Sequence, residues 1–389
     1  MALIGAAAAS PDDKVFADVV RQAREIAQTP WQSGEIVQPE ALQKLNYDTY
    51  RIITFRREEG LWFGDQSRFQ VQFFHPGYIY KQPVAIYEVD HGEARPVRFS
   101  PKFFRYHQLD AIGSAISGDE RLGFAGFRLL YPLDHDRPVD EVISFIGSSY
   151  FRALAAGQVY GISARGLAIN TAENLPEEFP AFRAFWLCKP APNAREMQFF
   201  ALLDSQSVSG AYRFLIRPGR QTTIEIENHL FFRKPVQVLA LAPLTSMFWR
   251  DEKDPRPPND RRPEVHDSDT LFIKTAEGES EVLALQQVDH VTTHVFPETN
   301  PKGFGLLQRD RDPAHYRDNE AKYSRRPSVM VEASGDWGAG KMHLLQLPTA
   351  NEYSDNVVAF WEPEKKPAAG DELEFKYRLR WFTRESNKQ

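Results

Sequence analysis

From residue 50 onward, this chain of 389 residues consists of short β-branched and aromatic runs separated by Gly, Pro, Asn and Asp. Examples are RIITF, FQVQFF, VAIYEV, EVISFIG, TTIEIENHLFF and ELEFKYRLRWF. Runs of this kind, bounded by turn residues, are typical of antiparallel strands. Helices do not alternate with them as a parallel α/β sheet requires. The sequence therefore predicts an all-β fold, a large antiparallel β-sandwich, and argues against a doubly wound nucleotide-binding fold.

Only the beginning of the chain has helical periodicity. In residues 16–28 apolar side chains recur with the spacing of about 3.6 that an amphipathic helix requires, and Pro30 ends the pattern. A second short helix is expected over residues 39–45. The preceding MALIGAAAAS has the small residues of a signal-peptide end but lacks a charged region. Residues 1–15 are therefore expected to be a flexible N-terminus or a signal remnant.

The charge balance excludes several classes of partner. Lys and Arg number 47 against 53 Asp and Glu, a net charge of −6, so the sequence predicts no basic face for nucleic acid. No apolar run approaches the roughly 18 to 20 residues of a membrane-spanning helix, so no membrane insertion is expected. Aromatic residues make up 13% of the chain. This content fits large stacked sheets, with rings left over for a carbohydrate-binding cleft.

Two acidic segments carry candidates for glycoside cleavage, which requires two carboxyl groups beside the bond. In PEVHDSDT, residues 263–270, an extended backbone places Asp267 and Asp269 on one face. Together with His266 these carboxylates could instead bind a cation. Because no second His accompanies them at ligand spacing, we expect no structural metal and no other cofactor.

The second acidic segment is PTANEYSDN, residues 348–356, a turn that contains Glu352 and Asp355. Two long polar loops, residues 251–262 and 308–327, are expected to be either functional or solvated linkers. Residues in or near these segments could orient a carboxylate or contact sugar, although each tryptophan could equally be core; they are Tyr323, Arg326, Trp249, Trp337 and Trp361.

Longer motifs carry a family resemblance. The runs NYDTYRIITFR, FFHPG, RPEVHDSDTL, NPKGFGLLQRDRDPAHYRDNEAKYSRRPSVMVE and GDWGAGKMHLLQLPTANEYSDNVVAFWEP resemble the periplasmic glucan biosynthesis family, OpgG and OpgD, also called MdoG. The match extends from about Phe16 to Trp381. It implies an exported, periplasmic protein whose sandwich is galactose-mutarotase-like and is followed by a smaller immunoglobulin-like domain. We therefore expect a glucan-processing domain over residues 16–383. Residues 384–389 would begin a linker, with the second domain absent from this chain.

The resemblance also implies an activity, an inverting endo-β-1,2-glucanase involved in osmoregulated periplasmic glucan biosynthesis. Carried over onto this sequence, Asp355 is the acid and Asp267 the base, with Glu352 and Tyr323 in a water-linked relay. The partners implied are β-1,2-glucan and a membrane glucan synthase. Two alternatives stay open: a transglycosylase that forms branched or cyclic glucan, and a non-catalytic glucan-binding scaffold. The residues expected to bind substrate are Arg326, Trp249, Trp337, Trp361 and His266.

Overall fold

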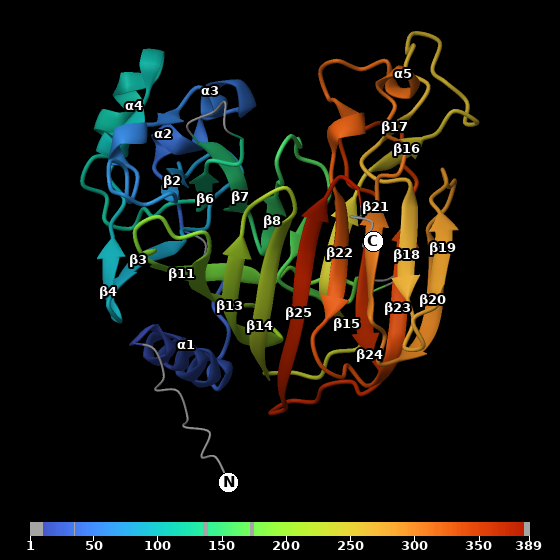
Figure 1. Ribbon diagram of the computed structural model, residues 1–389. Coiled ribbons are helices and arrows are strands. Elements are labelled where there is room, and N and C mark those ends of the chain that lie inside the picture. Colours follow the sequence, from blue (N-terminus) through green and yellow to red (C-terminus); the bar gives the residue numbers. More distant parts are fainter. Residues whose placement is uncertain (1–10, 35, 135–138, 172–174, 385–389) are drawn as a thin grey trace.

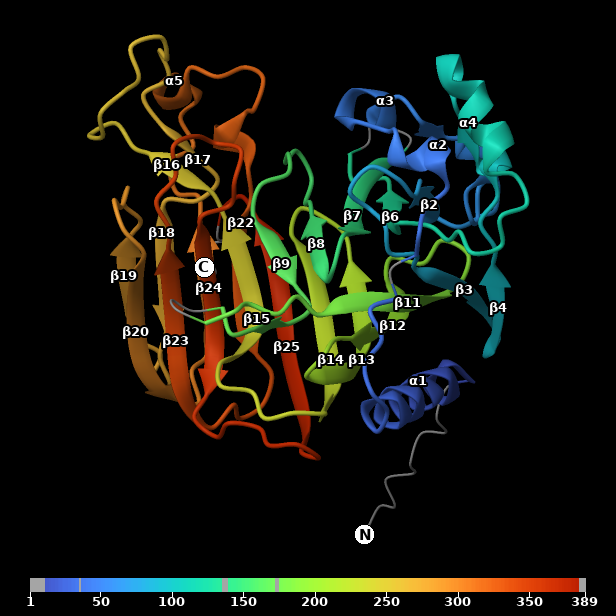
Figure 2. The same ribbon diagram turned by 180° about the vertical axis from the view of Figure 1, so that it is seen from behind.

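The computed structural model describes residues 11–34, 36–134, 139–171 and 175–384, and two large sheets stacked face to face dominate it (Figures 1 and 2). The strands of the first sheet, in spatial order, are β2 (Gln70–Phe74), β6 (Gly126–Tyr131), β7 (Asp140–Ile146), β8 (Tyr150–Ala153), β9 (Ser163–Arg165), β15 (Leu239–Ser246), β24 (Val357–Pro363), β23 (Ala339–Gln346) and β20 (Thr292–Thr299), with β10 (Ala168–Ile169) paired to β15.

The strands of the second sheet, in spatial order, are β19 (Ser280–Ala284), β18 (Thr270–Lys274), β21 (Gly303–Leu307), β22 (Ser328–Ala333), β25 (Glu372–Phe382), β14 (Thr222–Phe232), β13 (Val208–Arg217), β12 (Met197–Asp204), β11 (Ala181–Cys188), β3 (Ala85–Asp90) and β4 (Glu93–Val97). Among the described strand pairs, β3 with β11 is parallel, and the others are antiparallel. The predicted all-β antiparallel sandwich is confirmed.

Alternation along the strands builds the core between the sheets. In β14, Ile224 and Ile226 are buried, whereas Glu225 and Glu227 between them are partly exposed. Facing strands contribute aromatic rings to the same layer, such as Phe145 and Phe214 with centroids 5.4 Å apart. Because the side-chain period of a strand is two, the aromatic runs read in the sequence place their rings on one face.

The N-terminal helix α1 (Pro11–Ala27) covers the outer face of the second sheet, where it contacts β12, β13 and β14. Phe16 and Val19 are buried on its inner side, and Phe16 packs against Phe200 at 5.2 Å. The helix begins at Pro11, so residues 11–15, predicted to precede it, are part of it. The part of the predicted N-terminus that comprises residues 1–10 lies outside the described residues.

Short helices differ most from the sequence prediction. Helix α2 (Glu40–Gln43) falls within the expected range, but α3 (Tyr47–Arg51), α4 (Asp110–Ala115) and α5 (Pro313–Tyr316) were not expected. The run RIITF was predicted to be a strand, and only its end forms one, in β1 (Thr54–Phe55), which pairs with β5 (Phe104–Arg105). A capping box between Asn46 and Thr49 starts α3 instead, because each satisfies the other's backbone N–H.

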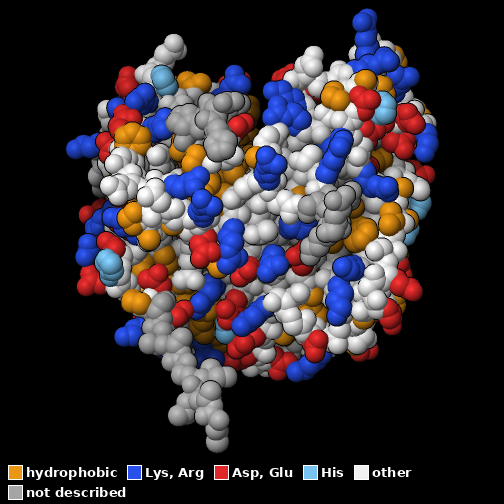
Figure 3. Space-filling model, viewed as in Figure 1, with side chains coloured by type: hydrophobic (Ala, Val, Ile, Leu, Met, Phe, Trp, Pro, Cys, Tyr) orange, Lys and Arg blue, Asp and Glu red, His pale blue; other side chains and the backbone are white. Residues whose placement is uncertain are grey.

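Two groups of loops rise from the same end of the sandwich. One contains α2, α3 and α4, and the other contains α5, β16 (Phe248–Arg250) and β17 (Val265–His266). The surface is hollowed between them, as Figure 3 shows at the top of the molecule. None of the helices in the described part of the chain has the length and apolarity that crossing a membrane requires.

Candidate active site

The two predicted aspartates lie on one side of this hollow, Asp267 directly after β17 and Asp355 two residues before β24. Ser246, the last residue of β15, pairs with Val357, the first residue of β24. Asn356 donates its N–H to the Ser246 carbonyl at 3.0 Å, and Asp267 donates its N–H to the Met247 carbonyl at 2.7 Å. Asp355 directly precedes Asn356. These backbone contacts therefore bring Asp355 close to Asp267, although the two are distant in the sequence.

Asp267 is almost fully buried, with 5% of its side chain exposed, and its carboxylate accepts a hydrogen bond from Nη1 of Arg326. Burial raises the pKa of Asp267 to about 6, and the nearby negative charge of Asp355 acts in the same direction. The positive charges of Arg326 and Arg152 oppose this rise. The pKa of Asp267 therefore lies closer to neutral than that of an ordinary aspartate, as is common for carboxyl groups at functional sites.

Asp355 lies nearer the surface, with 27% of its side chain exposed. Its carboxylate is 3.7 Å from Nη2 of Arg152, a residue of β8 that was not recognised in the sequence. Burial raises the pKa of Asp355, while Arg152 and Arg326 hold it down. The two carboxyl groups therefore share the field of the same two arginines, and burial favours the protonated form of both.

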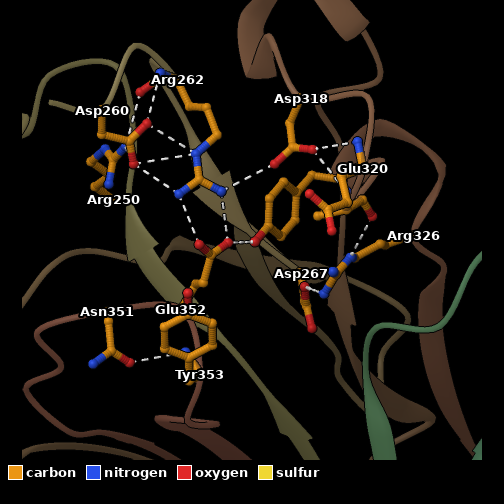
Figure 4. A network of polar contacts seen from close by, with 12 residues as sticks. Arg250, Asp260, Arg262, Asp267, Asp318, Glu320, Arg326, Asn351, Glu352 and Tyr353 are labelled. Atoms are coloured by element: carbon orange, nitrogen blue, oxygen red, sulfur yellow. Dashed lines mark hydrogen bonds and ion pairs between the residues drawn. The ribbon is translucent and has the colours of Figure 1, made fainter. Parts of the chain in front are cut away.

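A second arginine that the sequence did not reveal, Arg262, connects the loops around this pair (Figure 4). It donates two hydrogen bonds to Glu352, at 2.7 and 2.8 Å, and one to Asp318, at 3.1 Å. Its Nε and Nη2 also bind Asp260, which Arg250 contacts at 2.7 Å. Arg262 thus joins the loop before β17, the loop after β21 and the turn before β24.

Tyr323 and Glu352 lie beside this connection and contact one another. The buried Tyr323 donates its hydroxyl proton to Oε2 of Glu352, and the Arg326 guanidinium lies over the tyrosine ring at 4.3 Å. Hydrogen bonds from Arg262 lower the pKa of Glu352, whereas burial raises the pKa of Tyr323. At neutral pH the pair is therefore a carboxylate and a phenol, and the phenol oxygen can still accept a hydrogen bond from water.

Three of the residues expected to bind substrate are buried, which does not favour a direct contact with sugar. His266 is buried, and its nitrogens contact Gln308 at 2.8 Å and Glu264 at 3.1 Å, so neither is available to a ligand. Trp337 and Trp361 belong to the core between the sheets, with ring centroids 5.8 Å apart. Trp361 enters this core from β24, and Trp337 enters it from the connection between β22 and β23.

Trp249 is only partly buried and packs against the cluster that contains Tyr323. The Arg250 guanidinium covers its ring at 4.1 Å. Trp249 is thus the predicted tryptophan that the structure brings close to the site.

His266 and Asp267 do not form a metal-ligand set, because Glu264 and Gln308 contact the histidine while Arg326 binds the aspartate. Among the described residues, ligand-type side chains meet instead at Glu264, Asp310 and His315, whose ligand atoms lie within 4.8 Å of one another. His315 bonds to Asp310 at 2.6 Å and Glu264 to His266 at 3.1 Å. Each of the three therefore already has a hydrogen-bonding partner.

Comparison with known proteins adds a family. The family model described as "Periplasmic glucan biosynthesis protein, MdoG" matches residues 15–389. Glucans biosynthesis protein G of Ralstonia nicotianae is 45% identical over 364 residues, which cover 94% of this chain and 72% of that protein. Glucans biosynthesis protein D 1 of the same organism is 42% identical over 388 residues, covering 96% and 71%. Protein G of Pseudomonas syringae pv. tomato is 42% identical, and the match covers 95% of this chain and 57% of that protein.

Solved structures resemble the chain more distantly. A galactose mutarotase related enzyme from Lactobacillus acidophilus has a TM-score of 0.28 at 7% identity, over 66% of this chain and 94% of that one. The GH36 α-galactosidase AgaA from Geobacillus stearothermophilus has a TM-score of 0.33 at 8% identity, over 66% and 39%. At these values nothing about activity follows.

Proposed function

The chain belongs to the MdoG family of periplasmic glucan biosynthesis proteins, and from this membership we propose that it is an exported, inverting endo-β-1,2-glucanase. The observation that supports the activity is the pair Asp267 and Asp355, a buried and a partly exposed carboxyl group that both have a raised pKa and that interact with one another. Inverting glycosidases use such a pair, one as general acid and one as general base that activates water.

The surroundings of the two carboxyl groups favour different roles for them. Arg326 binds Asp267 directly, which stabilises its carboxylate and suits a base. Asp355 is the more exposed of the two, with Arg152 3.7 Å from its carboxylate, so it is the carboxyl group that a glycosidic oxygen reaches more easily. We therefore assign Asp355 as the acid that protonates the leaving glycosidic oxygen and Asp267 as the base.

Tyr323 and Glu352 would orient the attacking water. The carboxylate of Glu352 fixes the direction of the Tyr323 O–H bond, so the phenol oxygen offers its lone pairs to a water molecule. Because hydrogen bonds from Arg262 lower the pKa of Glu352, this carboxylate is the weaker base. The proton released from water then passes to Asp267, whose pKa is about 6.

The test uses Asp355→Asn and Asp267→Asn, which keep side-chain shape and remove proton transfer. With linear β-1,2-glucan as substrate, turnover should fall by roughly 10² to 10⁴ in each variant, while glucan binding persists. Product anomers resolved by NMR should show inversion. Larger, branched or cyclic products would favour the transglycosylase. Binding by the parent without any turnover would favour the scaffold, and variants as active as the parent would refute the site assignment.

A further inference from the structure

Four tyrosines form a continuous row of ring contacts on the other side of the hollow. Tyr47 lies 6.5 Å from Tyr78, Tyr78 lies 5.9 Å from Tyr50, and Tyr50 lies 5.5 Å from Tyr80. We call these residues the tyrosine row. None of the four takes part in the proposed mechanism.

Two unrelated segments build the tyrosine row. Tyr47 and Tyr50 lie in α3, and Tyr50 is held by a hydrogen bond from its hydroxyl to the His75 carbonyl at 2.8 Å. Tyr78 and Tyr80 come from a tight turn in which Gly77 and Tyr80 exchange backbone hydrogen bonds at 3.0 and 3.1 Å. Tyr78 has a φ of 58°, a left-handed conformation that aromatic residues rarely adopt. Conformations of this kind are concentrated at ligand-binding sites.

The tyrosine row begins at the surface and ends near the acidic pair. Tyr47 is 61% exposed, and α3 is the helix of its group that lies nearest the opposite loops in both Figure 1 and Figure 2. At the inner end, Tyr80 lies within the electrostatic range of Arg152, and Arg152 is 3.7 Å from Asp355. The row therefore extends outward from the residues that surround the acid.

A cavity of about 280 Å³ adjoins the inner end of the row. Its lining combines apolar and polar groups and includes Ile79, Tyr80, Gln82, Gly147 and Ser148. Gly147 lies beside the Tyr80 ring, and a Cβ placed on it would reach the ring edge at 3.6 Å. The volume lies just below the roughly 300 to 1,000 Å³ of pockets that enclose drug-sized ligands, which suits a single sugar unit.

We propose that the tyrosine row and this cavity form a remote subsite for glucosyl units of the same glucan chain, several units away from the bond that is cleaved. This inference rests on the proposed function. Tyrosine offers an apolar ring face to the C–H face of a sugar and a hydroxyl to its polar edge, at a low cost in conformational entropy. Among the described residues, Lys81 is the charged side chain in the cavity lining, so the surface suits a neutral sugar better than a polyanion.

A remote subsite has a defined kinetic consequence. It contributes the same binding free energy in the ground state and in the transition state. It therefore lowers KM for long chains and leaves kcat unchanged. Oligosaccharides too short to reach from Asp355 to Tyr47 gain nothing from it.

The experiment measures binding in an Asp355→Asn protein, which does not need turnover. Tyr47→Ala removes an exposed ring, and Tyr78→Asn removes a ring while keeping a residue that tolerates the left-handed backbone. Each change should weaken the affinity for long linear β-1,2-glucan roughly 3- to 10-fold in calorimetry and leave that for a disaccharide unchanged. Val282→Ala, 54% exposed on the edge strand β19, is the control and should alter neither.

The outcomes separate the two proposals. Long-glucan affinity that does not change in either tyrosine variant overturns the subsite, even if the parent cleaves glucan. A parent without turnover overturns the hydrolase but retains the subsite if the affinity losses are found. Failure of the Asp355→Asn protein to bind glucan of any length overturns the subsite as well.

Discussion

Replacing Arg326 by Gln should move the pH dependence of catalysis by an amount that follows from the structure. Arg326 gives Asp267 a charge-assisted hydrogen bond in a buried setting. Such a bond contributes about 1.5 to 3 kcal/mol, and 1.36 kcal/mol corresponds to a tenfold change in the ionisation constant. Without Arg326, the pKa of Asp267 should rise from about 6 to roughly 7 to 8.

The base acts only when it is ionised, so activity should follow its titration. At pH 7 the ionised fraction of Asp267 should fall from about nine tenths to between about one half and one tenth. We therefore expect kcat/KM on linear β-1,2-glucan to fall roughly 2- to 10-fold at pH 7 and the acidic limb of its pH profile to move to higher pH by about one to two units. The measurement is kcat/KM from pH 4 to 10, with the Asp267 carboxyl titrated directly by carbon NMR.

The neighbouring Arg325 provides a matched control. Its guanidinium donates to the Gly157 carbonyl at 2.7 and 2.9 Å rather than to either aspartate. Arg325→Gln should therefore leave the acidic limb of the profile in place. If the acidic limb of the kcat/KM profile were the same in Arg326→Gln as in the parent, Asp267 would not be the base. The same conclusion would follow if Arg325→Gln shifted this limb as much as Arg326→Gln does.

Three further changes test other parts of the site. Tyr323→Phe removes the hydroxyl that contacts Glu352. The value of kcat should fall about tenfold, which is less than in either aspartate variant. An unchanged kcat would show that Tyr323 is not part of the relay. Arg262→Met leaves partly buried carboxylates without their partner, and urea unfolding should show a loss of about 3 kcal/mol or more. Asp267 has a folded-state pKa of about 6 against about 3.9 unfolded, so the stability it contributes is present below pH 4 and is lost as pH rises through 6. Relative to the parent, Asp267→Asn should therefore gain up to about 3 kcal/mol between pH 4 and pH 7, and equal gains at both pH values would contradict this.

The local sequence pattern was sufficient to predict the sandwich. Which face of a strand is buried depends mainly on the alternation of apolar and polar residues along that strand. The run TTIEIENHLFF predicts both the strand β14 and its buried face. The same reasoning failed at RIITF, where β-branched residues favoured a strand. There, the capping box of Asn46 and Thr49 satisfies backbone donors that a strand would have left to sheet pairing, and α3 forms instead.

The site could be predicted only in part from the sequence. Asp267 and Asp355 were predicted through long family motifs, and the structure places both next to the end of β15, Asp267 through Met247 and Asp355 through the pairing of β15 with β24. Arg262 has a partner close by in the sequence, Asp260, but its link between the loops depends on Asp318 and Glu352, which are 56 and 90 positions away. Tertiary contacts of this kind depend on loop geometry, which single-sequence patterns do not encode.

The cost of the Arg262 network suggests why the two long loops are ordered. The network removes charged groups from water, namely Asp260, Asp318, Glu352 and their arginines. The cost of this desolvation offsets most of the attraction between the charges, so the network adds less to the stability of the fold than an apolar cluster of the same size would. An apolar cluster, however, could not fix the direction of a hydroxyl proton. Glu352 does so for Tyr323, and Arg262 keeps Glu352 ionised while joining it to Asp318 on the loop that carries Tyr323. The network therefore contributes mainly to the position of the proton-transfer groups, and its loss should impair catalysis before it unfolds the sandwich.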